Sequence, residues 1–580
     1  MALVRPHIFY GVLNAARLIA VQRRMAPGVA AGIVACVLGL TVAARESFAQ
    51  PVENRDDAIA GALRESLDEL QTTGNVSVEN AQLLSRNALP AIYSEGGYRA
   101  FWTPERLSLL LDLVKDSAGD GLLPEDYHLS ALERLASSGA IAGPDVAARA
   151  RGDLLATDSF YLLLYHLYVG KVDPKSFHPQ WNFDARPIQE PGGIRYVLDV
   201  LTQAKLREAI KQVRPDHWWY ERGRAALAAY RDIAARGGWP AIPQGKALKS
   251  GMKDKRILAL RQRLAATGEL SGESLDSEEF DEPLVKAVAA FQTTNRLNAD
   301  GAVGAGTLKE LNIPVEARIR QIRINLERGR WALHELGPGT LVIVDIAGFD
   351  VMYMQGGAAV WRSRVQVGKP YRETPIFKSK IDHIVFNPTW TVPPGIFAKD
   401  ILPGVKKDPN YLKKKGLDVI DSNGKKIDAS QIDWSRQTAS NFRYMLRQEP
   451  GADNALGRVK IMFPNPYLVY LHDTPSKALF EKEERAFSSG CMRVERPLEL
   501  AKLLLNDEQN WNTQSIDKVL ATGQTKTVLL RQPVPVLIMY WTIDLSAEGR
   551  VGFKRDPYNR DPKLAAALDA PFSAGQRRAP

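Results

Sequence analysis

The hydrophobic pattern of the amino-acid sequence changes at residues 337–339, Gly-Pro-Gly, and this break constrains the fold more than any other feature. Upstream, apolar residues recur at spacings of three and four, as in residues 58–70 and 104–113, which predicts amphipathic helices. Downstream, runs rich in β-branched residues, such as residues 341–346, predict strands. Because 580 residues are too many for one hydrophobic core, we expect two to four domains. The sequence therefore predicts a multidomain α+β protein.

The first fifty residues have the features of an export signal. Arg23 and Arg24 precede an apolar run over residues 29–42, and Ser47-Phe48-Ala49 offers the small residues of a cleavage site. We therefore expect residues 1–49 to be a signal peptide that is removed from the mature protein. An uncleaved membrane anchor is the alternative, because the segment before the apolar run is long, although about fourteen apolar residues are few for a membrane span.

Residues 50–245 predict a mostly helical domain. Residues 156–169 are apolar nearly all round, which is typical of a helix buried in a core. Aromatic clusters at residues 93–102 and 217–220 suit either sugar stacking or core packing, and core packing is the commoner use of such residues.

Residues 246–313 predict a separate compact unit, followed by a single helix. Apolar residues share one helical face over residues 257–264 and another over residues 284–291. A glycine-rich turn at residues 300–306 then leads into a short helix that ends near Asn312. Residues 314–338 predict an amphipathic helix with a basic face, which would pack on the preceding helical domain or bridge to the next domain.

The β-rich domain is expected to span residues 339–545. Further strands are predicted at residues 359–367, 459–462, 467–471 and 534–544, and a helix at residues 497–506. A polar, lysine-rich insertion at residues 397–455 interrupts the β pattern, and such charge runs are usually solvated. Residues 546–580 are predicted to be a C-terminal tail.

Cys491 is the leading candidate for a catalytic residue. Cleavage after Ala49 would remove Cys36, the other cysteine, so Cys491 would have no disulfide partner in its own chain. A thiol is a strong nucleophile only as the thiolate, and His472, nineteen residues upstream, would supply the base. An inert buried cysteine is the other explanation, which the neighbouring glycine and arginine disfavour.

The neighbours of Cys491 also suit nucleophilic catalysis. Gly490 permits a tight turn, so that the amides of Ser489, Gly490 and Cys491 would point at a developing oxyanion. Arg493 adds a fixed positive charge that is suited to holding a carboxylate. These residues together predict acyl transfer through a thioester.

Two motifs resemble those of a known family. His-Asp-Thr-Pro at residues 472–475, followed by Ser-Ser-Gly-Cys-Met-Arg-Val at residues 488–494, resembles the signature of the L,D-transpeptidases. Within this family the chain is most similar to the large periplasmic type that carries a peptidoglycan-binding domain, because residues 287–312 resemble that small three-helix domain. Most members have a histidine directly before the Gly-Cys pair, where this chain has Ser489. The change leaves His472 as the only histidine near Cys491 in sequence.

The resemblance assigns a role to each region. It implies a helical scaffold at residues 50–245, a peptidoglycan-binding domain at 246–313, a linker or scaffold helix at 314–338, and a mostly-β catalytic domain at 339–545. The insertion at residues 397–455 would then be a lid that keeps water from the thioester.

The resemblance also adds candidate substrate-binding residues. It places Asn387 and Trp390 beside the cleft, although Trp390 suits core packing equally well. Tyr470 would border the pocket or belong to the core, and Arg493 would contact substrate. Whether residues 246–313 bind glycan or serve only as a spacer stays open.

The implied function is that of a periplasmic peptidoglycan L,D-transpeptidase in cell wall biogenesis. Such an enzyme forms 3→3 cross-links between donor and acceptor tetrapeptide stems, and carbapenem-type inhibitors would acylate Cys491. An L,D-carboxypeptidase or exchange enzyme on the same stems is one alternative. A non-catalytic peptidoglycan-binding scaffold is the other.

Neither a metal nor an organic cofactor is implied, because His128, His166, His178 and His217 lack the tight spacing of a metal site. Residues 1–49 carry five arginines and one glutamate, so cleavage lowers the formal charge from +10 to +6. This modest positive balance suits an anionic polymer such as the cell wall. Nucleic acid is not expected as a partner of an exported chain without a concentrated basic motif, and the sequence leaves any protein partner unknown.

Overall fold

The computed structural model describes residues 53–184, 192–271, 275–546 and 549–572. Glu53–Pro580 form one compact unit, and the predicted signal peptide at residues 1–49 lies outside the described residues. Over the described part of the chain, none of the helices has the length and apolar character that crossing a membrane requires.

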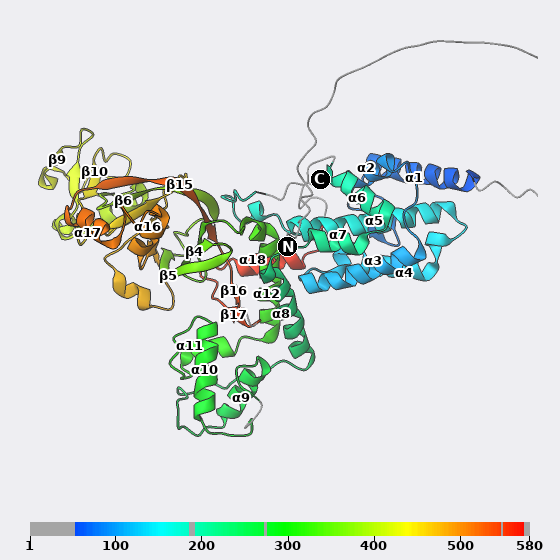
Figure 1. Cartoon of the computed structure of the whole chain (residues 1–580), viewed down its shortest axis with the longest axis horizontal. Helices are drawn as coiled ribbons and strands as arrows, with labels where there is room; N and C mark the ends of the chain where they lie inside the picture. Colours follow the sequence, from blue (N-terminus) through cyan, green and yellow to red (C-terminus); the bar gives the residue numbers. More distant parts are fainter. Residues whose placement is uncertain (1–52, 185–191, 272–274, 547–548, 573–580) are drawn as a thin grey trace, which may run out of the picture. The chain divides into compact units, whose positions relative to one another are not determined.

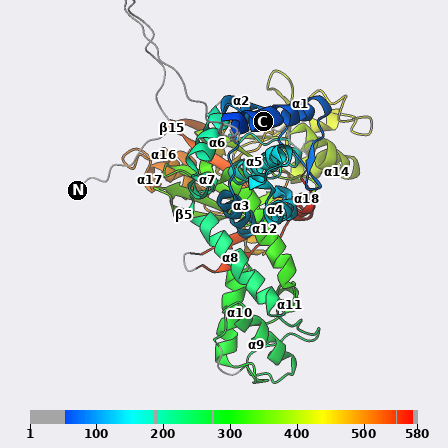
Figure 2. The ribbon, with the colours of Figure 1, turned by 90° about the vertical axis from the view of Figure 1, so that its right-hand side faces the viewer.

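Helices α1 to α8 build the N-terminal region that the sequence predicts to be helical (Figure 1). Their bounds are Glu53–Thr73, Ala88–Glu95, Pro104–Asp116, Leu129–Ser138, Val146–Val169, Gly192–Gln203, Leu206–Val213 and Trp218–Ala235. Helix α5 is buried along most of its length and packs beside α3 and α4 (Figure 2). The buried carboxylate of Asp153, on α5, accepts hydrogen bonds from the backbone N–H groups of Phe101 and Trp102. This helix therefore anchors a loop as well as filling the core.

Core packing explains most of the aromatic residues of this region. Tyr93 and Trp102 are buried, as are Trp219 and Tyr220. Trp218 is the exception, because 47% of it is exposed. At residues 93–102 the structure thus favours core packing over sugar stacking.

A three-helix unit follows, as the sequence predicts. Its helices are α9 (Arg256–Ala266), α10 (Glu282–Thr294) and α11 (Ala305–Leu311), which lie together in Figure 1. Buried residues from all three helices, including Leu260, Val288 and Leu308, form a separate hydrophobic cluster. This cluster gives the unit a core of its own.

Helix α12 (Val315–Ala332) lies where a linker or scaffold helix is predicted, and several of its arginines are buried. Three of them are buried against carboxylates: the pairs are Arg318–Glu310, Arg328–Asp561 and Arg330–Glu327. The helix packs on α8 and on α18 (Asp561–Asp569), which leaves little of its surface free. The predicted basic face is therefore largely an internal ion-pair network.

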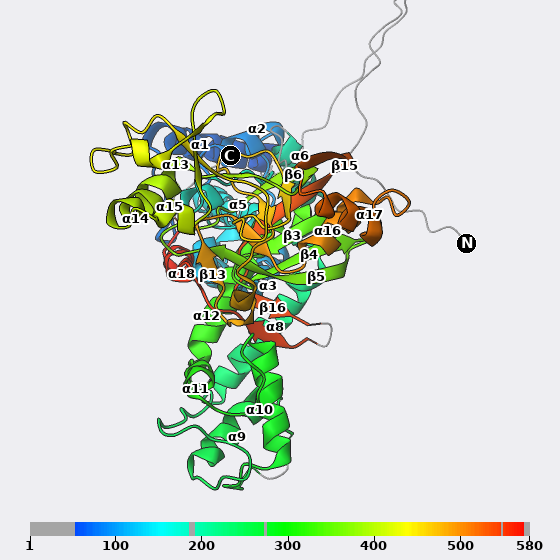
Figure 3. The same ribbon diagram turned by 90° about the vertical axis from the view of Figure 1, so that its left-hand side faces the viewer.

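The C-terminal region is a mostly-β domain, as the sequence predicts. Its main sheet has the strand order β13-β5-β14-β12-β11-β6-β15-β3-β4, and a further pairing of β4 with β5 closes the sheet on itself. The strand bounds are β3 Leu341–Asp345, β4 Asp350–Gln355, β5 Ala358–Gly368, β6 Phe377–Phe386, β11 Val459–Met462, β12 Leu471–His472, β13 Ala486–Ser488, β14 Met492–Val494 and β15 Lys526–Met539. Figure 3 shows β3, β4 and β5 side by side.

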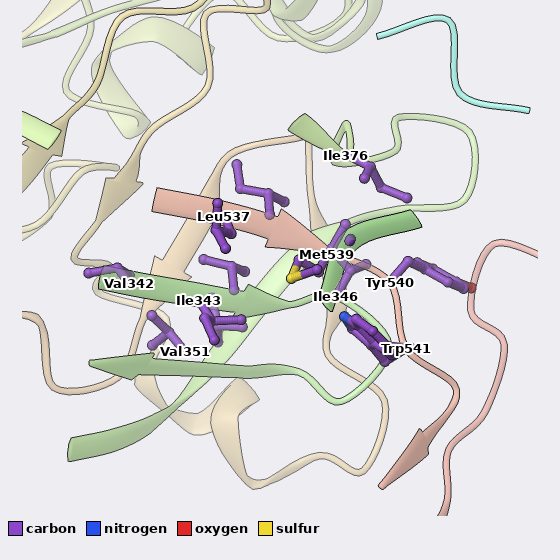
Figure 4. Packing of buried hydrophobic residues seen from close by; sticks show 14 of the residues in the cluster. Val342, Ile343, Ile346, Val351, Ile376, Leu537, Met539, Tyr540 and Trp541 are labelled. Atoms are coloured by element: carbon purple, nitrogen blue, oxygen red, sulfur yellow. The ribbon is translucent and has the colours of Figure 1, made fainter. Parts of the chain in front are cut away.

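The core of this domain lies where β15 and β3 run in parallel. Val342, Ile343 and Leu537 from these strands are buried and meet Val351 of β4 and Trp541, as Figure 4 shows. Helices α16 (Pro497–Leu505) and α17 (Thr513–Ala521) complete the domain.

The insertion predicted at residues 397–455 belongs to a folded subdomain with its own core, which begins earlier than predicted, at Trp390. It contains α13, α14 and α15, seen together in Figure 3, and a small sheet in the order β7-β10-β8-β9. The bounds are β7 Trp390–Thr391, α13 Pro394–Ile396, α14 Leu402–Lys407, α15 Tyr411–Lys414, β8 Asp418–Ile420, β9 Lys426–Ile427 and β10 Met445–Gln448, with a π-helical turn at Phe397–Ile401. Buried residues such as Phe397, Val405 and Leu446 form its hydrophobic cluster. The lysines lie on the surface of this subdomain, so the prediction of a solvated charge run describes its exterior.

The predicted C-terminal tail is wrong for residues 549–572, which are folded against the rest of the chain. Strands β16 (Ile543–Leu545) and β17 (Val551–Phe553) pair across the predicted domain boundary, and helix α18 packs on α12. The hydroxyl of Tyr558 donates a hydrogen bond to the carbonyl of Gly368 at 2.8 Å. Buried apolar residues of α18, such as Leu564 and Leu568, explain why this segment is held in place.

Candidate active site

Cys491 occupies the short turn between β13 and β14. Gly490, before it, has a φ of +115°, a conformation that glycine adopts without strain and other residues do not. The thiol is half-buried, and it lies 3.7 Å from the carbonyl oxygen of Leu468, to which it donates a weak hydrogen bond. The predicted tight turn at the nucleophile is therefore present in the structure.

The loop that carries this carbonyl is held by one asparagine. The side-chain oxygen of Asn465 accepts hydrogen bonds from the N–H groups of Tyr467 and Val469, and its amide donates to the carbonyls of Phe463 and Val469. Leu468 has a φ of +56°, which is uncommon for a residue with a side chain. This turn explains why the strand predicted over residues 467–471 is shorter than expected.

His472 lies at the end of β12 and is buried. Its Nδ1 is hydrogen-bonded to the carbonyl oxygen of Asp473. Because a carbonyl oxygen can only accept, Nδ1 carries the proton and Nε2 keeps a free lone pair. The carboxylate of Asp473 is used elsewhere, since it accepts hydrogen bonds from the Lys477 ammonium and from the N–H of Arg458. The backbone of Asp473, not its side chain, therefore orients the imidazole.

Cys491 and His472 line the same cavity, which has a volume of about 390 Å³. Four other residues predicted from the sequence also line it: Tyr470, Ser489, Arg493 and Trp390. No hydrogen bond joins Cys491 to His472 among the described residues, because the thiol is turned toward Leu468. The geometry thus brings a nucleophile, a base and a cation to one cavity.

The environment of the imidazole favours its neutral form. Burial lowers the pKa of His472 to about 3, and the positive charges of Arg493, Lys460 and Lys477 act in the same direction. The hydrogen bond to Asp473 opposes this shift but does not reverse it. His472 is therefore neutral at physiological pH, and its Nε2 is unprotonated.

The thiol is also neutral at rest. Burial raises the pKa of Cys491, whereas hydrogen bonds from the backbone and hydroxyl of Tyr470 and the charges of Lys460 and Arg493 lower it. The resting pair is therefore a thiol beside a neutral imidazole, in a positive field that favours the thiolate once it forms.

The turn before Cys491 is tied to the predicted lid. Arg372 donates one hydrogen bond to the hydroxyl of Ser489 at 2.8 Å and pairs with Asp400. The N–H of Gly490 donates to the hydroxyl of Ser488 at 3.1 Å, so this amide is not free to meet an oxyanion in the present geometry. The oxyanion role of Ser489 and Gly490 stays a prediction.

The structure does not bring Asn387 to the cavity. Its side-chain amide donates hydrogen bonds to the carbonyls of Val519, Leu520 and Gln524, at 3.1 to 3.2 Å. These carbonyls lie at and beyond the end of α17, where the regular hydrogen bonds of the helix stop. Asn387 thus caps a helix, and its expected contact with substrate is not supported by its position.

Trp390 combines the two roles considered for it. It lines the cavity and also packs against the hydrophobic cluster of the lid subdomain. Gly395, Ile396 and Lys399, at the start of this subdomain, line the cavity too. The insertion therefore borders the site, as a lid would.

Lys460, on β11, is a site residue that the sequence analysis missed. Its Nζ lies 4.0 Å from the centroid of the Tyr470 ring. The sequence predicts a strand at residues 459–462, but only the pairing of that strand reveals the neighbours of Lys460. The motif around Cys491 gives no signal for it.

Comparison with known families identifies the three parts of the chain. Residues 339–536 match the family described as L,D-transpeptidase catalytic domain, and residues 87–227 match a family described as Scaffold domain. Residues 253–311 match a family described as "Putative peptidoglycan binding domain". These segments of the chain thus match an L,D-transpeptidase catalytic domain and a peptidoglycan-binding domain, which confirms the resemblance and the multidomain α+β fold predicted from the sequence.

One named relative is similar to part of the chain. A protein of Haemophilus influenzae named "Putative L,D-transpeptidase" is 38% identical over 201 residues, which are 35% of this chain and 40% of that protein. The match therefore spans less than half of either protein.

Solved L,D-transpeptidase structures are more distant. Those from Xylanimonas cellulosilytica and Stackebrandtia nassauensis are 14% and 13% identical. They cover 51% and 52% of this chain and 99% and 96% of their own, with TM-scores of 0.17 and 0.20. At such scores they add nothing to the family match.

Proposed function

We propose that the protein is a peptidoglycan L,D-transpeptidase that forms 3→3 cross-links between tetrapeptide stems through a thioester on Cys491. The observation that carries this proposal is the shared cavity of Cys491 and His472, in which the imidazole keeps a free Nε2. The L,D-transpeptidase and peptidoglycan-binding matches support peptidoglycan as the substrate. A polymer outside the cytoplasm also fits the predicted export to the periplasm.

In the first half-reaction, Cys491 is acylated by the donor stem. Its thiol rotates away from Leu468 and gives its proton to Nε2 of His472, while the sulfur attacks the carbonyl carbon of the third stem residue. The carbon–sulfur bond forms, the bond to the terminal D-alanine nitrogen breaks, and His472 returns the proton to that nitrogen. Arg493, which lines the cavity, is suited to hold a carboxylate of the stem.

In the second half-reaction, the side-chain amine of an acceptor stem attacks the thioester. A carbon–nitrogen bond forms as the carbon–sulfur bond breaks, and the proton lost by the amine passes through His472 to the departing sulfur. Water in place of the amine would give a carboxypeptidase instead. The lid subdomain borders the cavity and would limit the access of water to the thioester.

The test is the intact mass of the purified protein after incubation with a disaccharide-tetrapeptide, compared with the Cys491→Ala variant. We expect a covalent adduct, release of D-alanine and a 3→3 dimer from the wild-type protein alone. A cleaved monomer without dimer would replace the proposal by an L,D-carboxypeptidase. Absence of adduct and product from both proteins, with peptidoglycan still bound, would leave only a binding scaffold.

A further inference from the structure

Three neighbouring strands place one cation on each side of His472. Lys460 of β11 is the antiparallel register partner of His472 on β12, and His472 is the parallel register partner of Arg493 on β14. Residues paired in this way project from the same face of a sheet. His472 therefore stands between an ammonium and a guanidinium.

Lys460 reaches the nucleophile through an aromatic ring. Its Nζ lies over Tyr470, 4.0 Å from the ring centroid, which is the geometry of a cation–π contact. Tyr470 in turn lines the same cavity as Cys491, and its hydroxyl lowers the pKa of that thiol. The ring centroids of Tyr470 and His472 are 5.6 Å apart in an edge-to-face arrangement. One tyrosine thus connects Lys460 with both reacting groups.

The charge of Lys460 is maintained against an unfavourable environment. The side chain is half-buried, and burial lowers its pKa. Among the described residues, the negative charge that opposes this effect is that of the Cys491 thiolate. A buried cation without a carboxylate partner is costly, and its placement here makes the thiolate its natural counter-ion.

We propose that Lys460 is a positioning residue for the nucleophile. The ammonium of Lys460 acts through Tyr470 to favour the Cys491 thiolate. It also makes His472 a ready proton donor once the imidazole has taken the thiol proton. The inference rests on the proposed function for its chemical meaning. An imidazolium between two cations gives up its proton readily, which is what departure of the D-alanine nitrogen requires.

Other charged and titratable groups also surround the thiol of Cys491. They are Tyr470, directly before β12, His472 of β12, Arg493 of β14, Arg372 and Glu373 of the loop after β5, and Lys399 of the insertion. Arg372 is already paired with Asp400, whereas Arg493, among the residues that the structure describes, donates one long hydrogen bond of 3.4 Å to the side-chain oxygen of Gln366. Arg493 and Lys460 are therefore the two cations that we expect to act on the thiolate.

The test measures the reactivity of the thiol directly. In a Cys36→Ala background, Cys491 is the sole cysteine, and its alkylation by iodoacetamide is followed between about pH 5 and pH 10. The variants are Lys460→Met, which keeps an apolar stem of similar length, and Lys460→Arg, which keeps the charge. Lys526→Met is the matched control, because Lys526 also lies on a barrel strand over an aromatic ring, Trp511, at 5.2 Å.

For Lys460→Met we expect the alkylation profile to move to higher pH, with a roughly three- to tenfold slower reaction at pH 7. Lys460→Arg should stay within about twofold of the parent, and Lys526→Met should leave the profile in place. An unmoved profile for Lys460→Met, or an equal shift for Lys526→Met, would overturn the inference. If Lys460→Met does not fold, as judged by its thermal transition, Lys460→Gln carries the same expectation.

The outcome is independent of the proposed function. Alkylation needs no peptidoglycan, so a protein without transpeptidase activity would still give a thiol profile. Conversely, an active enzyme with an unmoved Lys460→Met profile would refute the role of Lys460 alone.

Discussion

Lowering the pH is expected to destabilise the strands around His472. Burial and the nearby cations lower the pKa of His472 to about 3, whereas a histidine in an unfolded chain titrates near 6.5. The unfolded state therefore binds a proton first, so the stabilisation is present above about pH 6.5 and is lost as the pH falls toward 3. At pH 5, the difference between the two pKa values predicts a loss of about 2 kcal/mol in the free energy of unfolding.

Hydrogen exchange measured by mass spectrometry can detect this loss locally. After correction for intrinsic exchange, peptides that cover β12 and β14 should open roughly thirtyfold more often at pH 5 than at pH 7. Residues 246–313 contain no histidine and provide an internal control. His472→Asn keeps a donor for the Asp473 carbonyl but cannot titrate, so it should lose this acid sensitivity. Equal acid sensitivity in His472→Asn and in the wild-type protein would refute the reasoning.

Two further predictions concern ion pairs at different depths. Glu327→Ala leaves the fully buried guanidinium of Arg330 without its carboxylate and should lower the free energy of unfolding by about 3–5 kcal/mol, measured by hydrogen exchange in α8 and α12. The control is Glu316→Ala on the exposed side of α12, which should change stability by less than about 0.5 kcal/mol. A loss below about 1 kcal/mol for Glu327→Ala would contradict the buried pair. Arg372→Gln removes the contacts of Arg372 with both Asp400 and Ser489. Because the Arg372–Asp400 pair is partly exposed, we expect a loss of stability of only about 1 kcal/mol, seen as about fivefold faster hydrogen exchange in α14. Unchanged exchange in α14 would show that Arg372 does not hold the insertion in place.

The sequence predicted the parts of the site that depend on neighbours along the chain. Cys491 follows Gly490 in a turn that needs positive φ, and both are close in sequence to Arg493. His472 was assigned by residue type and motif, and strand pairing brings it to the same cavity. The helices, the three-helix unit and most strands were likewise predicted, because hydrophobic periodicity is a local property.

The residues that were misassigned depend on distant partners. The sequence predicted a basic face for α12 but not which carboxylates, Asp561 and Glu327, would pair with Arg328 and Arg330 in the interior. Asn387 matched a family element, yet the end of α17, more than a hundred residues later, takes its hydrogen bonds. Lys460 gains its significance only from the register of β11 with β12.

The folded C-terminal segment has a consequence for how the protein is made. Lys171, buried in the N-terminal scaffold, pairs with Asp126 and donates hydrogen bonds to the carbonyls of Leu568 and Ala570, at 2.8 and 2.7 Å. These partners lie almost four hundred residues apart in sequence. The scaffold therefore cannot acquire its final set of contacts during synthesis until residues near position 570 have emerged. Until then, a lysine destined for the interior keeps two of its donors exposed to water, and the first domain to be synthesised is among the last to be completed.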